Sequence, residues 1–272
     1  MMNLRTFLCF VVFTASSLTA MAEDLGYRYL QKEDDRQPYC QRENDRDYGL
    51  NPGYWGQCGD LTGANATGAV MPNADLRGAV LKGADLSGAD LRYAKFDGAN
   101  LKDAKLVRTN LEAISYRDGV MWGADFTEAN LVNAKFSYSN GFSGTKFDRA
   151  KLDGASFRYV NLISSSFESA SAIGAEFFRN AQGDANFRSA NLTRASFVGT
   201  TLDGANFTNA IAINADFTDA RLYWIDGLKS ADLTGAIFCD ASFDSPSGAG
   251  FIYRCDANPA GRPPHRPVGV AL

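Results

Sequence analysis

A large apolar residue returns every five positions over most of this chain, and this period constrains the fold more than any other feature. The series runs from Leu61 to Phe136, resumes one residue late at Phe142, and slips again at Leu228 before it ends at Phe243. We call its members the series positions. Only four of the 37 are not Leu, Phe, Met or Tyr: Ala66, Ala172, Gln182 and Ala212. Self-similarity at a fixed short period indicates a repeat architecture.

The residues around each series position repeat as well. Ala stands two places earlier in 26 of the 37 units, and Asp or Asn stands one place earlier in 15. The run Ala84-Asp85-Leu86-Ser87-Gly88 is one such unit. Over residues 61–243 the chain therefore resembles the pentapeptide-repeat family, whose unit reads A-(D/N)-L-x-x. The resemblance implies an all-β fold, a right-handed quadrilateral β-helix in which each unit forms one face of a square coil.

The spacing of Phe independently favours an even number of faces. From Phe147 to Leu222, Phe alternates with a smaller residue at the series positions, so Phe returns every ten residues. With four faces per coil, two opposite faces would stack Phe on Phe, and the other two would stack mainly Leu. Coils of 20 residues give about nine coils over residues 61–243. At the ~4.8 Å separation of paired strands, they form a rod roughly 43 Å long.

Two irregularities interrupt this pattern. The slips predict surface bulges near residues 137–141 and 225–227, because a register shift inside a coil would turn the core outward. Gln182 places a polar side chain at an inward position. It requires either hydrogen-bond partners in the core or a local outward distortion, and the sequence leaves both alternatives open.

Residues 1–22 have the layout of a secretory signal. A basic start ending at Arg5 precedes a short apolar stretch, and Ala20-Met21-Ala22 precedes Glu23. The alternative is a buried N-terminal helix. No later segment reaches the ~18 apolar residues that a membrane-spanning helix needs. We therefore expect an exported protein, periplasmic or secreted, with no membrane span.

Removal of this segment would leave four cysteines, an even number that suggests two disulfides in an exported chain. Residues 23–60 and 244–272 flank the repeats and are expected to cap the open edges of the end coils, the second as a cap followed by a Pro-rich tail. A disulfide needs Cα atoms within about 7 Å, and the rod keeps its two ends apart. The alternative is four free thiols in a cytosolic protein. The prediction is two local pairs: Cys40–Cys58 and Cys239–Cys255.

The composition argues against catalysis. The single histidine, His265, lies in the Pro-rich tail, so no Ser-His or Cys-His arrangement is available. No cysteine pair has C-x2-C spacing, and no phosphate-binding G-x4-G-K loop is present. Carboxylates one place before the series positions recur with the repeat, which indicates structural hydrogen bonding. We expect no enzyme activity, no catalytic residue, no metal and no cofactor.

Binding through the outward positions of the repeat is the remaining possibility. On the face of Phe136, Phe157 and Phe177, the outward positions combine aromatic and arginine side chains, as interface anchors do. Tyr138 and Tyr159 are 21 residues apart across the first slip and should stack on successive coils. The alternative is a solvated face whose aromatic ladders stabilise neighbouring coils. The candidate partner-binding residues are Tyr138, Arg158, Tyr159, Phe178 and Arg179, with Asp97 and Arg117 on the same stripe.

Two functions of different classes follow. Some members of the family mimic DNA and act on DNA gyrase, a type II topoisomerase, which requires a cytoplasmic location and a strongly negative surface. Residues 61–243 carry 20 acidic and 18 basic side chains, which argues against mimicry. The net charge of −4 also argues against binding nucleic acid. The preferred hypothesis is an exported structural or interaction module that presents flat β faces to an unknown protein or cell-envelope component.

Overall fold

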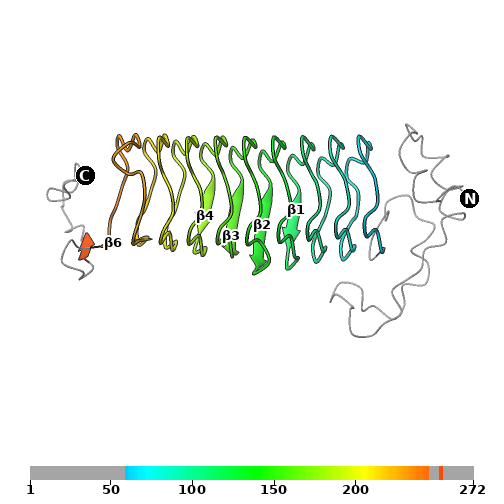
Figure 1. Cartoon of the computed structure of the whole chain (residues 1–272), viewed down its shortest axis with the longest axis horizontal. Helices are drawn as coiled ribbons and strands as arrows, with labels where there is room; N and C mark the ends of the chain where they lie inside the picture. Colours follow the sequence, from blue (N-terminus) through cyan, green and yellow to red (C-terminus); the bar gives the residue numbers. More distant parts are fainter. Residues whose placement is uncertain (1–58, 245–250, 254–272) are drawn as a thin grey trace, which may run out of the picture.

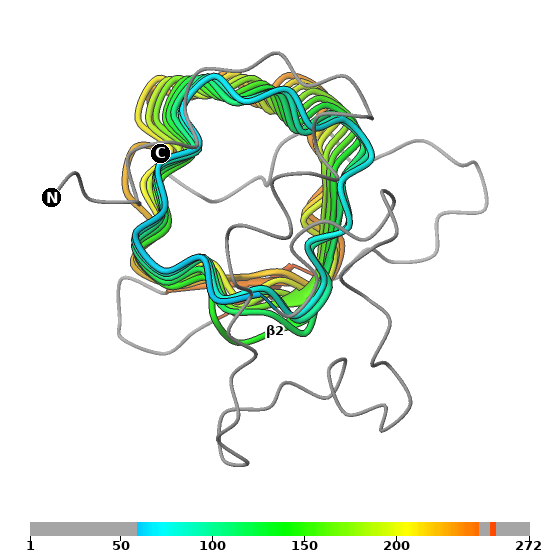
Figure 2. The ribbon, with the colours of Figure 1, turned by 90° about the vertical axis from the view of Figure 1, so that its right-hand side faces the viewer.

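The computed structural model describes residues 59–244 and 251–253 and has the architecture of a four-sided parallel β-helix (Figures 1 and 2). Successive coils pair in parallel at a spacing of 20 residues, beginning with the bridge between Asp60 and Val80. Equivalent bridges follow every five residues, so each coil contains four units. This is the fold that the resemblance to the pentapeptide-repeat family implies, with the even number of faces that the spacing of Phe favours. No helix of the length and apolarity needed to cross a bilayer occurs in these residues.

Longer strands form where pairing between coils extends beyond a single bridge. Four of them lie on successive coils and form one parallel sheet in chain order, visible along one side of the rod in Figure 1. Its register places Tyr116 beside Phe136 and Phe157 beside Phe177. The four strands are β1 (Ser115–Arg117), β2 (Lys135–Ser139), β3 (Ser156–Val160) and β4 (Glu176–Phe178).

A second, three-stranded sheet closes the C-terminal end of the described rod. β5 (Arg221–Leu222) pairs in parallel with β6 (Ala241–Phe243), as the coils do. β7 (Phe251–Tyr253) then pairs with β6 in the antiparallel sense. The last coil therefore has a strand of opposite direction on its outer edge.

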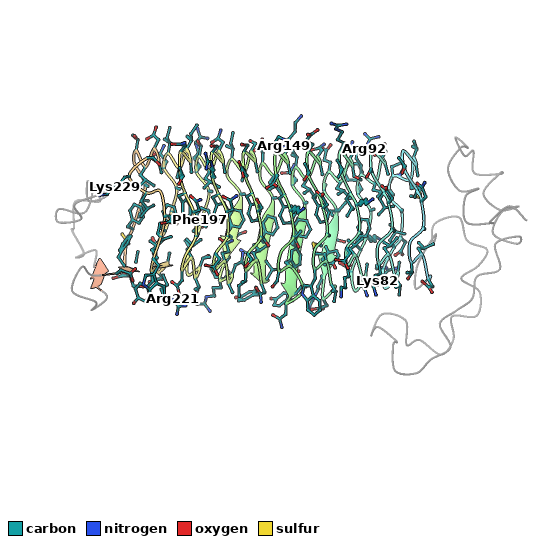
Figure 3. The ribbon with its side chains drawn as sticks, in the orientation of Figure 1. Lys82, Arg92, Arg149, Phe197, Arg221 and Lys229 are labelled. Carbon is teal, nitrogen blue, oxygen red and sulfur yellow. The ribbon has the colours of Figure 1, made fainter. Side chains whose placement is uncertain are left out.

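Two ladders of Phe rings fill opposite sides of the lumen. Within each ladder the rings of successive coils stack, as Phe157 does on Phe177 with centroids 5.1 Å apart. Across the lumen the ladders meet edge to face, as Phe167 and Phe177 do at 5.7 Å and 89°. Figure 3 shows Phe197 inside the rod, with Arg92 and Arg221 at its margins. The predicted pair of Phe ladders is confirmed: the first holds Phe136, Phe157, Phe177, Phe197, Phe217 and Phe238, and the second holds Phe126, Phe147, Phe167, Phe187 and Phe207.

The first slip is a surface bulge where the sequence predicts it. Val120 pairs with Gly141, a spacing of 21 residues, whereas pairing just before the bulge has a spacing of 20. The Ser139 side chain is buried and Asn140 is exposed, so Asn140 is the residue that loops out. Position 141 requires glycine, because a Cβ there would lie only 2.9 Å from the Cα of Val120 and would clash with it.

The second slip lies later than predicted. Asp226 still pairs with Asn206 at the normal spacing, and the 21-residue spacing is first seen at Asp232 opposite Ile211. The extra residue therefore follows Gly227, within residues 228–231, just beyond the predicted residues 225–227. Gly227 causes the difference, because it occupies the register of Phe207 and packs so closely on the Thr208 backbone that a Cβ would overlap it.

Gln182 follows neither of the alternatives that its sequence position left open. Its side chain is fully buried, so the chain does not distort outward. Its Oε1 and Nε2 atoms have no hydrogen-bond partner among the described residues.

Candidate interaction surface

One corner of the rod carries a regular row of outward side chains. These residues stand two places after Tyr116 and after each inward residue of the first Phe ladder. They share a left-handed backbone, with φ between 50° and 65°, so their Cα–Cβ bonds or glycine hydrogens leave the chain in equivalent directions. Parallel pairing places consecutive members one coil apart, as the 3.2 Å bond from the Arg179 amide to the Val198 carbonyl shows. We call this set the corner row: Asp118, Tyr138, Tyr159, Arg179, Gly199, Asp219 and Asp240.

Tyr138 and Tyr159 stack within the corner row, as predicted, with ring centroids 5.2 Å apart and planes 16° from parallel. The Arg117 guanidinium lies 5.0 Å above the Tyr138 centroid, and Phe178 meets Tyr159 edge to face at 5.6 Å. Tyr138 remains 54% exposed and Tyr159 41% exposed. Because the stack covers much of the ring faces, it offers a partner mainly ring edges and hydroxyl groups.

Two guanidinium groups flank Phe178, each 5.4 Å from its ring centroid. Arg158 is paired with Glu176 at 2.5 Å, whereas Arg179 makes no ion pair with any described carboxylate. The structure thus brings together all five predicted partner-binding residues. We call Tyr138, Arg158, Tyr159, Phe178 and Arg179 the aromatic–arginine cluster. The cluster contains the ion-paired guanidinium of Arg158. It also contains the guanidinium of Arg179, which has no carboxylate partner among the described residues and can bind an anionic group.

The ion pair between Arg158 and Glu176 shifts the pKa of both groups. The hydrogen bond from Arg158 lowers the pKa of Glu176, and the same bond raises the pKa of Arg158. Both groups are therefore charged at neutral pH. Asp97, farther along the stripe, is different, because burial raises its pKa against the opposing influence of Arg77.

Asn180 supports the corner beneath the cluster. Its carboxamide accepts a 3.0 Å hydrogen bond from the Val160 amide and donates one of 3.0 Å to the Phe157 carbonyl. At ordinary corners these two backbone groups bond to each other, as Ala155 and Leu152 do. The buried side chain of Asn180 thus links β3 to the next coil at the corner where Tyr159 projects.

Sequence reasoning missed a second support, at Tyr116. Its buried hydroxyl donates to the Ala99 carbonyl at 2.9 Å. The Tyr116 hydroxyl lies where a Cβ of residue 119 would stand, so only glycine fits at position 119. The sequence does contain a signal for this contact. Tyr116 replaces the usual Leu or Phe at a series position, and Gly119 replaces the usual Ala three residues later.

Cys239 lies half-buried in the last coil, while Cys40, Cys58 and Cys255 fall outside the described residues. Both predicted disulfide pairings therefore stay predictions, as does the proposed signal segment, residues 1–22. In residues 59–244 and 251–253, no group of three or more His, Cys, Asp or Glu side chains is placed to hold a metal ion.

The sequence matches the family model described as pentapeptide repeats, with eight copies. The matched residues are 60–95, 116–140, 142–177 and 185–222. The chain belongs to the pentapeptide-repeat family. No curated protein sequence gives a match.

Solved structures of pentapeptide-repeat proteins are also similar to this chain. One is HetL from the cyanobacterium Nostoc, described as involved in heterocyst differentiation regulation; it is 24% identical, with 68% of this chain and 92% of HetL covered and a TM-score of 0.41. Another is a trypsin-treated variant of QnrB1, described as a plasmid-mediated fluoroquinolone resistance protein. It is 20% identical, with 65% of this chain and 88% of QnrB1 covered and a TM-score of 0.46. At these identities, the likeness concerns the fold alone.

Proposed function

We propose that this pentapeptide-repeat protein is an exported, non-enzymatic interaction module. Its aromatic–arginine cluster would contact another protein or a component of the cell envelope. The observation that carries the proposal is the association of stacked Tyr138 and Tyr159 with Arg179, whose guanidinium has no carboxylate partner among the described residues. Exposed tyrosine and arginine side chains are the residue types enriched at the energetic centres of protein interfaces.

The signal-like residues 1–22 support export, and so does the even number of cysteines outside them, which is the number that two disulfides require. Stable disulfides are typical of oxidising compartments outside the cytoplasm. The cysteine nearest to Cys239 in sequence is Cys255, which supports the proposed local pair at the C-terminal end.

The charge pattern of the rod favours an interaction module over a DNA mimic. A mimic of DNA needs a row of negative charge along its length. Instead, one outward ladder alternates in sign from coil to coil. It runs through the successive bridges of Asp85, Lys105, Asp125 and Lys146. Lys105 contributes to lowering the pKa of Asp85, although the hydrogen bond from Ser87 is the larger cause.

The intact mass of the protein, expressed with its own N-terminus, tests export and disulfide formation together. We expect a chain that begins at Glu23 and gains the mass of four hydrogens when its two disulfides are reduced. Mass spectrometry before and after reduction measures both. An uncleaved chain with free thiols would contradict export, and the gyrase alternative would then be the first to test.

The double substitution Tyr159→Ala/Arg158→Ala tests the cluster. It removes one ring of the stack and the partner of Glu176, so we expect a loss in affinity for the bound partner of about tenfold or more, because interface anchors each contribute more than ~1 kcal/mol. The binding partner would first be captured with a photo-crosslinking residue at position 138 and then titrated against purified variants.

A matched control uses another face of the same coils. Thr193→Ala/Arg194→Ala also removes an arginine and a neighbouring outward side chain, and Arg194 has the same left-handed backbone. The control should bind normally, and both double variants should keep the circular dichroism of the native protein. Equal affinity of the cluster variant and the native protein would rule the cluster out as the contact.

A further inference from the structure

The charges of the corner row change sign along the rod. Arg179 is the cation of the row, and the two members nearest the C-terminal end are Asp219 and Asp240. No described residue forms an ion pair with Arg179, Asp219 or Asp240. Among the described residues, one edge of the rod thus carries a cation and two anions that have no ion-pair partner, in separate places.

The spacing of these charges is symmetric about Gly199. Arg179 lies one coil before Gly199, and Asp219 lies one coil after it. Tyr159 lies two coils before Gly199, and Asp240 lies two coils after it. A rotation of 180° about an axis through Gly199 and perpendicular to the rod therefore places Arg179 on Asp219 and Tyr159 on Asp240.

We propose that two copies of this chain pair side by side and antiparallel through the corner row, with the two-fold axis at Gly199. Arg179 of each copy then meets Asp219 of the other, and the Tyr159 hydroxyl donates to the Asp240 carboxylate. A two-fold interface repeats every contact, so the dimer contains two of each pair. This pairing goes beyond the proposed function and does not depend on export.

The centre of this surface suits close approach. Gly199 has no side chain of its own, and the stem of Arg179 lies over it, with the Arg179 Cγ 3.3 Å from where a Cβ of residue 199 would stand. Val198 and Thr218 beside Gly199 are small and only partly exposed. Phe178, which is also partly exposed, lies one coil to the other side. The centre is therefore formed by small side chains and the stem of Arg179, which lets two rods approach closely enough for Arg179 and Asp219 to meet.

Charge selects the antiparallel arrangement over the parallel one. In a parallel pair, a two-fold axis along the rod would place each corner-row residue against its own copy. Arg179 would then face Arg179, and Asp219 would face Asp219. Like charges brought together at an interface cost several kcal/mol, so only the antiparallel arrangement brings opposite charges into contact.

Charge reversal tests the proposal by sedimentation equilibrium of the full chain. The native protein should form dimers at micromolar concentration, and added salt should weaken them. Arg179→Asp and Asp219→Arg should each raise the dimer dissociation constant by about tenfold or more, because each creates two like-charge contacts. The double variant Arg179→Asp/Asp219→Arg should restore dimerisation, because it exchanges the signs of both partners. Arg194→Asp, on another face with the same backbone conformation, should dimerise like the native protein.

Each other outcome overturns the pairing. A native protein that stays monomeric shows that the corner row does not self-associate. A dimer that survives both single reversals uses another surface, and a double variant that stays monomeric excludes contact between Arg179 and Asp219. A monomer that still loses its partner on Tyr159→Ala/Arg158→Ala would overturn only the dimer and leave the proposed function standing.

Discussion

Replacing Phe167 with Ala is expected to lower the free energy of unfolding by about 3–5 kcal/mol. Phe167 is fully buried and lies between Phe147 and Phe187, with both ring centroids at 4.9 Å. Its edge also meets rings of the first Phe ladder, at 6.1 Å and 5.7 Å. Alanine would leave a cavity that the flanking rings cannot fill, because each is held by the next ring of its own ladder. Urea unfolding monitored by circular dichroism measures the loss.

Two matched variants separate packing from the mere removal of an aromatic ring. Phe167→Leu introduces the residue that the Leu-rich faces carry, and it should lose roughly half as much or less. Phe178→Ala removes a ring that is only partly buried, on the outside of the same coils, and should cost about 1 kcal/mol or less. A loss below ~1 kcal/mol for Phe167→Ala would contradict the inward position of this side chain.

Replacing Gln182 with Leu is expected to raise the free energy of unfolding by about 1–3 kcal/mol. The amide of Gln182 is fully buried and has no hydrogen-bond partner in the described part of the chain, so the folded protein bears the cost of removing this polar group from water. Leucine has nearly the same size, and it would continue the pattern of Leu162 and Leu202 on that face. The same urea titration measures the gain, which should appear as a higher midpoint with an unchanged slope.

Thr200→Val is the control for this result. Thr200 is also a buried polar residue, but its hydroxyl donates to the Phe177 carbonyl at 2.5 Å. Valine has the same shape and removes a satisfied hydrogen bond, so this variant should not be stabilised. If Gln182→Leu proved no more stable than the native protein, the amide of Gln182 would have to be satisfied in solution.

The regular part of this molecule was predictable from sequence because each unit obeys the same physical rule. An inward apolar residue every five positions fixes which side chains enter the lumen, and Phe at every tenth position fixes which faces carry aromatic ladders. The stacking of Tyr138 on Tyr159 followed from the same arithmetic, once the first inserted residue was counted.

The parts that sequence reasoning missed depend on contacts between coils. The second bulge lies beyond Asp226 because Gly227 packs against Thr208, a contact that no five-residue pattern records. Asn180 stands at an inward position that Ala occupies in most units, yet its sequence position does not say that it would bond two backbone groups of the previous coil. The charge symmetry of the corner row likewise appears only when residues about 40 positions apart are placed on one edge.

β7 makes the C-terminal edge of the described rod different from the edge of a repeating coil. Each coil could in principle serve as a template for another coil, because the parallel edge of one presents the hydrogen-bonding groups that the next requires. β7 occupies that edge at β6 and runs the opposite way, so a further coil cannot be added there in register. The described C-terminal end is thus blocked on the face of β6, which opposes elongation there while the long sides of the rod remain available for association.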